Sequence, residues 1–141
     1  MTADAQTIRK ADRLILPGVG AFGDAMDKLS ATGLVPVIRE QAAQKPLLGI
    51  CLGMQLLFEK SYEYGEHGGL GFVKGEVCPL EPDLKDKTLK VPQIGWNACT
   101  SYGMTRFSDT SVRASMSITS TATTAKIVPG VHLLSAITPS P

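Results

Sequence analysis

Several features that would mark a specialised class of protein are missing from this sequence. Its 141 residues carry 14 Lys and Arg against 13 Asp and Glu, so there is no excess charge to attract nucleic acid or an acidic membrane surface. No uncharged apolar run reaches membrane-spanning length, and the opening MTADAQTIRKADR lacks the apolar segment of a signal peptide. We therefore expect a cytoplasmic protein with a small, neutral substrate or partner, and neither a nucleic-acid nor a membrane ligand.

Cysteine is also scarce, and the three cysteines do not form a pattern. Cys51, Cys78 and Cys99 are odd in number, include no CxxC pair and have no histidines at metal-ligand spacing. Such a set favours neither a disulfide framework nor a zinc site. We predict free thiols, no metal and no cofactor.

The apolar residues that are present alternate between two patterns. Residues 12–22 form an apolar run broken by proline and glycine, which predicts a buried strand and a loop. Helical spacing begins at Asp24 and is interrupted around Gly33 and Pro36. Residues 47–50 predict a central strand covered on both faces. This order predicts an α/β fold, a three-layer sandwich with a mostly parallel sheet.

The second half of the chain differs in composition. Glycine and proline are frequent after residue 63, with short strands predicted at 71–77 and 89–94. Residues 99–141 then hold 16 Ser and Thr, against six in the preceding 98 residues, without helical or strand periodicity. We predict one domain over 1–98 and a Ser/Thr-rich tail over 99–141 that is disordered or foreign to the domain.

Cys51 stands between two glycines at a predicted strand-to-helix junction, in the stretch GICLG. This pattern parallels the nucleophile elbow of α/β hydrolases, where a strained turn projects the nucleophile and flanking side chains would clash. Gly49 and Gly53 meet that steric requirement. The following helix would favour the thiolate, and the backbone N–H of Leu52 would stabilise an oxyanion. The alternative is that Cys51 is a small buried apolar residue.

Four segments together carry a family resemblance: PLLGICLGMQLLFE, LILPGVGAFGDAM, GLG and KVPQIGWN. They resemble the class I glutamine amidotransferases, and among these the glutaminase subunits of imidazole glycerol phosphate synthase, over residues 11–98. The resemblance implies that Cys51 attacks the side-chain amide of L-glutamine and leaves a glutamyl thioester. The released ammonia would pass to a (β/α)8 cyclase subunit of a heterodimer in histidine biosynthesis. Alternatives are another class I amidotransferase, or a non-catalytic fragment that retains at most partner docking.

The resemblance also implies roles for other residues. Val19 and Gly20, in the loop after the first strand, would supply the second oxyanion donor. Substrate contacts would come from Gly18, Gly53 and Gln55. The residues by themselves are equally compatible with a turn that needs glycine for its dihedral angles, and with Gln55 on an exposed helix face.

The partner interface is implied by the segment KVPQIGWN. In the family this segment faces the cyclase subunit, which assigns the contact to Gln93, Trp96 and Asn97. Many members have histidine where this chain has Gln93. A lone tryptophan is also a common core anchor, so the residue type does not decide the role of Trp96.

A cysteine hydrolase of this type needs a histidine and a carboxylate, which the family supplies in an H-P-E sequence near its C-terminus. This chain has no H-P-E, and His132 is followed by two leucines. We interpret His67, in a glycine-rich loop, as a loop residue. The chain also begins near the family's second strand. The resemblance therefore predicts an incomplete domain without glutaminase activity of its own.

A shifted reading frame would account for the tail. Residues 115–125 permit, in another frame, the string YVYYVHSYYG, which resembles the YVYFVHSYY segment of the family. We therefore predict that a frameshift near Ala98 replaced the native C-terminal part. The alternative is a divergent, disordered tail.

Overall fold

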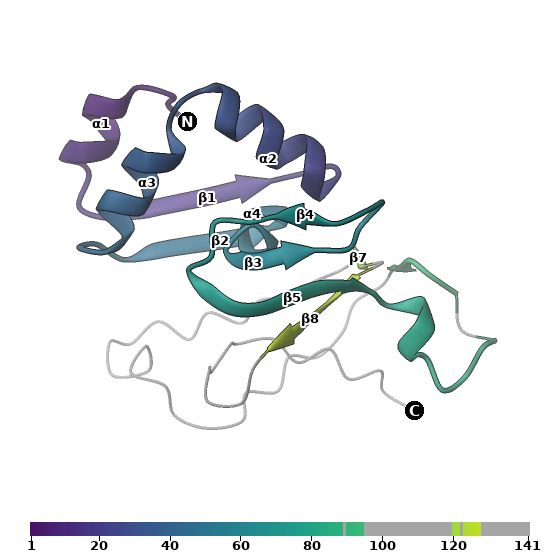
Figure 1. Ribbon diagram of the computed structural model, residues 1–141. Helices are drawn as coiled ribbons and strands as arrows, with labels where there is room; N and C mark the ends of the chain where they lie inside the picture. The colour runs from purple at the N-terminus through teal and green to yellow at the C-terminus, as the bar shows by residue number, and fades with distance from the viewer. Residues whose placement is uncertain (89, 95–119, 122, 128–141) are drawn as a thin grey trace, which may run out of the picture.

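The computed structural model describes residues 1–88, 90–94, 120–121 and 123–127 (Figure 1). In the first half, the elements are α1 (Ala5–Lys10), β1 (Leu14–Gly18), α2 (Phe22–Ala31), α3 (Val35–Ala42), β2 (Leu47–Cys51) and α4 (Leu52–Gln55). They are followed by β3 (Phe58–Ser61), β4 (His67–Gly68), β5 (Val73–Pro79), the 3-10 turn η1 (Glu81–Asp83), β6 (Gln93–Ile94), β7 (Ser120–Thr121) and β8 (Thr123–Ile127). Within this part of the chain, no helix combines the length and apolar character that a membrane span requires.

Strands β1 and β2 pair in parallel, from Leu14 opposite Leu47 to Gly18 opposite Cys51. Helices α2 and α3 connect them, and Figure 1 shows α1, α2 and α3 grouped beside β1. The predicted pair of parallel strands separated by two helical segments is confirmed. Pairing in this register brings the carboxyl ends of both strands to the same edge of the sheet.

The predicted interruption between the helical segments is a helix end followed by a helix start. Gly33 has φ +69° directly after the C-cap of α2, a conformation that glycine adopts without steric cost. Pro36 lies in the first turn of α3, where the missing N–H leaves no helical hydrogen bond unmade. These two residues therefore divide one apolar pattern into two helices.

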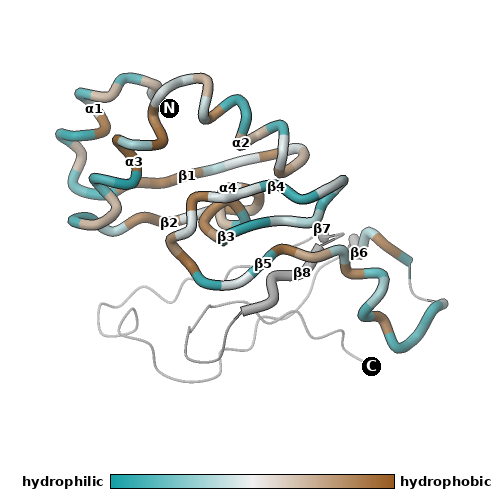
Figure 2. Tube along the Cα trace, viewed as in Figure 1, coloured by the Kyte–Doolittle hydropathy of each residue, from teal (hydrophilic) through white to brown (hydrophobic). Residues whose placement is uncertain are grey.

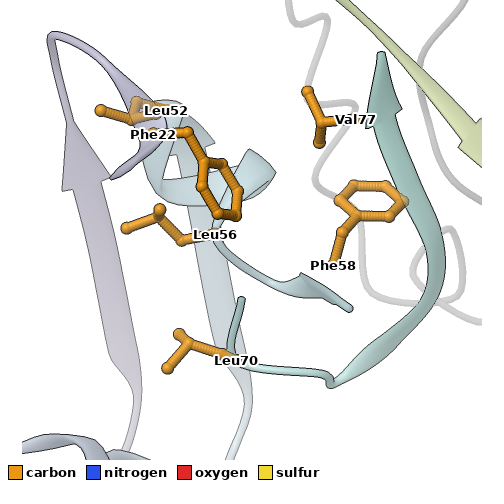
Figure 3. Close-up of a cluster of buried hydrophobic side chains, with 6 residues drawn as sticks. All are labelled: Phe22, Leu52, Leu56, Phe58, Leu70 and Val77. Atoms are coloured by element: carbon orange, nitrogen blue, oxygen red, sulfur yellow. The ribbon is translucent and has the colours of Figure 1, made fainter. Parts of the chain in front are cut away.

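The core lies between α2, α4 and the strands that follow. Six buried side chains converge there in Figure 3: Phe22, Leu52, Leu56, Phe58, Leu70 and Val77. Both phenylalanines are 0% exposed. Complete burial of such a side chain stabilises a fold by about 1.5–3 kcal/mol. The cluster thus ties the start of α2 to the helix that follows Cys51.

The second sheet has the strand order β4-β3-β5-β8. β3 pairs antiparallel with β4 and parallel with β5, so the strand predicted at 71–77 is present as β5. Of the strand predicted at 89–94, the structure describes β6 over two residues. The described residues thus form an α/β arrangement with small parallel and mixed sheets.

The prediction that residues 47–50 are covered on both faces is wrong for the described residues. Leu48 and Ile50 are 47% and 38% exposed, and Ile15, opposite Leu48, is 64% exposed. Side chains alternate along a strand, and Leu16 on the other face packs with side chains of α2 against the core. The helices therefore cover one face, although Figure 2 shows hydrophobic residues along β1 and β2. The predicted third layer is not confirmed.

Residues 99–141 lack strand periodicity in their sequence, yet they supply two described strands, β7 and β8. β8 pairs antiparallel with β5 over five positions, from Gly75 opposite Ile127 to Pro79 opposite Thr123, and β7 pairs with β6. An open strand edge presents unpaired N–H and C=O groups, and the β-branched residues of TTAKI favour an extended backbone. Pairing with β5 therefore stabilises a strand that the local sequence pattern does not predict. The remainder of the tail lies outside the described residues.

Candidate functional site

Cys51 is the last residue of β2 and the N-cap of α4, as predicted for an elbow. Its φ of 55° and ψ of −123° are unusual for a residue with a side chain. Such a conformation costs about 1–3 kcal/mol and persists only where the surrounding structure imposes it. Cys51 is exposed, so the alternative of a buried apolar residue is wrong. The thiol is thus held in a strained turn with access to solvent.

The two glycines around Cys51 are required by backbone contacts. A Cβ on Gly49 would lie 2.7 Å from the backbone nitrogen of Met54. A Cβ on Gly53 would overlap the carbonyl oxygen of Leu16 and lie 2.6 Å from its carbonyl carbon. Real Cβ atoms do not approach backbone this closely, so α4 can pack against β1 and β2 only where side chains are absent.

The loop after β1 begins beside this turn. Gly18 is the register partner of Cys51, and a Cβ on Gly18 would lie 2.9 Å from the backbone nitrogen of Gly53. Gly20 has φ +101° and Val19 is 90% exposed. The dihedral angle explains why glycine occupies position 20. The oxyanion role of Val19 and Gly20 stays a prediction.

Leu52 is the first residue of α4, where a backbone N–H has no partner within the helix. Its side chain is 2% exposed, which fixes the backbone that carries this N–H. Because α4 has only four residues, its aligned dipole is short. Any anion stabilisation next to Cys51 therefore depends on individual N–H groups more than on a long helix.

The predicted substrate residues Gly18, Gly53 and Gln55 lie around the same turn. Gln55 is half-buried at the end of α4, which differs from the alternative of an exposed helix face. A Cβ on Gly18 would meet the backbone of Gly53, and a Cβ on Gly53 would meet that of Leu16, so both positions have a steric reason to be glycine. Their contact with substrate stays a prediction.

Two of the three cysteines are described: Cys51 is exposed and Cys78 is buried on β5. Cys99 lies outside the described residues. In the described ranges, no three His, Cys, Asp or Glu side chains gather in a way that could hold a metal ion. Solvent access thus distinguishes Cys51 from Cys78.

The predicted interface and the histidines are described only in part. Gln93 lies in β6, whereas Trp96, Asn97 and His132 fall outside the described residues. His67 begins β4 and is not in a loop, because it pairs with Ser61 of β3. Its imidazole packs against Gly23, where an added Cβ would lie 2.7 Å from Nδ1. His67 is therefore a packing residue between the hairpin and α2.

Glu63 is a residue of the site region that sequence reasoning missed. Its Oε2 accepts a hydrogen bond from the backbone N–H of Phe22 at 2.8 Å. The N-cap residue Ala21 makes no side-chain capping bond. A helix that starts after alanine has N–H groups without a side-chain cap, so they need an acceptor from elsewhere in the chain. The alanine before the helix was the feature of the sequence that could have indicated such an acceptor. Glu63 thus caps α2 from 41 positions away.

Comparisons with known proteins point to one family. The family model "Glutamine amidotransferase class-I" matches residues 1–128. Imidazole glycerol phosphate synthase subunit HisH of Sulfurimonas denitrificans is 57% identical over 95 residues, which are 67% of this chain and 46% of the relative. HisH of Wolinella succinogenes is 61% identical over 87 residues, 61% of this chain and 42% of the relative.

HisH of Aquifex aeolicus is 58% identical over 95 residues, which are 67% of this chain and 44% of that relative. The chain thus spans less than half the length of each of these relatives. The matched family model covers both strand ends, the cysteine turn and β8. The chain belongs to the class I glutamine amidotransferase family.

Proposed function

We propose that the protein from which this chain derives hydrolyses L-glutamine to glutamate and ammonia, with Cys51 as the nucleophile. The observation that carries the proposal is the exposed Cys51 at φ 55°, seated between two sterically required glycines in a family of glutamine amidotransferases. Release of ammonia from glutamine, and its loss in the Cys51→Ala variant, is the test.

In the proposed reaction, the Cys51 sulfur attacks the side-chain amide carbon of glutamine and a tetrahedral oxyanion forms. The N–H of Leu52 and an N–H of the Val19–Gly20 loop donate hydrogen bonds to that oxyanion. Its collapse breaks the C–N bond, releases ammonia and leaves a glutamyl thioester, which water then hydrolyses to glutamate. The substrate would be held by Gly18, Gly53 and Gln55.

Proton transfer is the step for which this sequence lacks the H-P-E histidine of the family. The leaving nitrogen must gain a proton and the attacking water must lose one, which is the work of a histidine in such hydrolases. The sequence contains no H-P-E segment. The proposed activity therefore belongs to a polypeptide of the relatives' length and is not expected of these 141 residues.

We propose that the ammonia passes to a (β/α)8 cyclase subunit that forms imidazole glycerol phosphate, and that Gln93, Trp96 and Asn97 contact this subunit. The similarity to relatives named as subunits of imidazole glycerol phosphate synthase supports a heterodimer. The alternatives are a class I amidotransferase of another pathway and a docking fragment without catalysis. Measuring whether ammonia release is coupled to a cyclase distinguishes the proposed heterodimer from these two alternatives.

Replacing Trp96 with Ala should weaken binding of an extended polypeptide to the cyclase by at least about tenfold, because interface tryptophans commonly contribute that much. Binding is measured by calorimetry, and coupling by comparing product formation from glutamine with that from added ammonium. Lys28→Ala, on the exposed side of α2, is the control and should change neither quantity. Equal coupling in the Trp96 variant would contradict the interface role.

We also propose that the uncovered face of β1 and β2 is covered in a polypeptide of the relatives' length, as a three-layer sandwich requires. The exposed apolar side chains of Ile15, Leu48 and Ile50 support this, since an apolar sheet face is stabilised by a covering layer. Such a layer would also separate these strands from water and reduce aggregation at this surface.

Leu48→Ser tests the third layer. We expect a change in unfolding free energy within about 1 kcal/mol in the 141-residue polypeptide and a loss of about 2 kcal/mol or more in an extended one. Leu47→Ser, at a half-buried position, is the control and should destabilise both the 141-residue and the extended polypeptide. Chemical denaturation measures each value. Equal small effects of Leu48→Ser in both polypeptides would exclude the covering layer.

The reducing cytoplasm is the proposed compartment, because the reaction needs Cys51 as a free thiol. We further propose that the boundary near Ala98 is one of sequence origin, with a frameshift as the source of residues 99–141; strand β8, which pairs with β5, would then be formed by frameshifted sequence. The abrupt rise in serine and threonine supports this origin. Reading the encoding DNA across this boundary tests it: one uninterrupted frame in independent isolates would exclude the frameshift.

A further inference from the structure

The turn between β3 and β4 carries a second residue with an unusual backbone. Among the residues that the structure describes, Cys51 and Tyr64 are the two non-glycine residues with positive φ, and both have φ 55°. This left-handed region suits glycine and asparagine, whereas a tyrosine there is strained by its Cβ. The sequence thus places a bulky side chain at a turn position where a smaller residue would be more stable.

Tyr64 gains little from packing within the described part of the chain, because it is 90% exposed. Tyr62, two positions earlier, differs from it. Tyr62 is half-buried, and the centre of its ring lies 4.8 Å from Lys60 Nζ. An exposed ring also leaves apolar surface in water. Tyr64 therefore destabilises the chain in two ways, through its backbone conformation and through its exposed ring.

This turn lies at the edge of the molecule that carries Cys51. Glu63, the neighbouring turn residue, has its Oε2 2.8 Å from the backbone nitrogen of Phe22, and Figure 1 shows the turn beside the start of α2. A loop of three residues joins Phe22 to Gly18 at the end of β1. Gly18 is in turn the register partner of Cys51. The exposed ring therefore belongs to the rim of the site around the cysteine.

The chemistry of the proposed reaction determines what faces this rim. Ammonia leaves the carboxamide at Cys51, and at an edge open to water it would be protonated and lost by diffusion. The subunit that receives the ammonia must therefore cover the same edge and exclude water there. An exposed tyrosine on the rim suits this contact, because tyrosine is enriched among the residues that dominate protein–protein binding.

We propose that Tyr64 is a docking residue for the ammonia-accepting subunit, and that its strained backbone holds the ring outward for this contact. The inference rests on the proposed function, which supplies the partner. In the complex, burial of the ring against the partner offsets the destabilisation that Tyr64 causes in the free chain. A substitution that relieves the strain should therefore stabilise the chain and weaken the complex.

The effect on stability is measured by thermal unfolding of the 141-residue polypeptide. Tyr64→Asn should raise the midpoint by about 2–4 °C, because asparagine tolerates positive φ and the exposed apolar ring is removed. Tyr64→Phe keeps both the strain and the ring, so it is the matched control and should leave the midpoint unchanged. A midpoint that stays the same or falls in the Asn variant would overturn the proposal, because the ring would then be packed within the chain.

Binding is measured by calorimetry with an extended polypeptide and the cyclase subunit. Tyr64→Asn should weaken the complex at least about tenfold, while Tyr64→Phe should stay within about threefold of the unchanged protein. Phe72→Asn controls for the loss of an exposed aromatic ring elsewhere and should leave the affinity unchanged. Phe72 is 38% exposed, and its backbone N–H donates to Leu57, so that β3 lies between this contact and the turn.

Three results separate this inference from the proposed function. If Trp96→Ala weakens the complex and Tyr64→Asn does not, the docking role of Tyr64 is wrong and the proposed heterodimer stands. A raised KM for glutamine in Tyr64→Asn without the cyclase, at unchanged cyclase affinity, would mean that Tyr64 contacts substrate and would also overturn the docking role. An extended polypeptide with neither glutaminase activity nor cyclase binding would contradict the proposed function itself, and the docking role with it.

Discussion

An extended polypeptide that includes the upstream strand and the shifted frame is expected to release ammonia from glutamine, and Cys51→Ala is expected to reduce that rate by at least about 1,000-fold. The sulfur is the group that forms the thioester, so its removal eliminates the covalent pathway. The 141-residue polypeptide should show no appreciable turnover, because it lacks the H-P-E histidine. Ammonia release with and without the cyclase partner measures both results, and the rate should be highest with the partner bound.

A glutamine-like electrophile identifies the reacting thiol by mass spectrometry. It should modify Cys51 in the extended polypeptide, while Cys78, which is buried, stays unmodified. The Cys78→Ala variant is the matched control and should retain turnover. Labelling of Cys78 or Cys99 in place of Cys51 would contradict the assignment. Efficient turnover by the 141-residue polypeptide would mean that His67 or His132 acts as the base.

Replacing Gly53 with Ala is expected to destabilise the fold by about 3 kcal/mol or more. The new Cβ would overlap the carbonyl of Leu16, and this carbonyl belongs to a strand whose register with β2 is set by five residue pairs. Because backbone on both sides resists movement, the clash cannot be relieved by a side-chain rotation. Urea unfolding measures the loss of stability.

Gly68→Ala is the control for the effect of alanine itself. Gly68 lies in β4, and a Cβ there would meet no atom within 4 Å, so the change in stability should stay within about 1 kcal/mol. A Gly53 variant as stable as the Gly68 variant would show that α4 can move away from β1. In that case glycine at position 53 would not be a steric requirement of the turn.

Local sequence by itself determined the parts of the site that depend on near neighbours. A cysteine between Gly49 and Gly53, after an apolar run, predicted the strained turn, and Cys51 has φ 55° there. Gly33 and Pro36 predicted where the helical pattern divides. These features follow from the backbone conformations that glycine and proline allow. Such effects extend over only a few residues, so they can be predicted from the local sequence.

Only the tertiary structure decided the features that depend on distant partners. An apolar strand does not reveal which of its faces a helix covers, so the exposure of Leu48 could not be read from its pattern. Strand β8 exists by pairing with the edge of β5, and Glu63 caps a helix 41 positions away. For β8 and for the Glu63 cap, the stabilising contact comes from a segment remote in sequence, and hydrogen bonding to that segment outweighs the weak local preference.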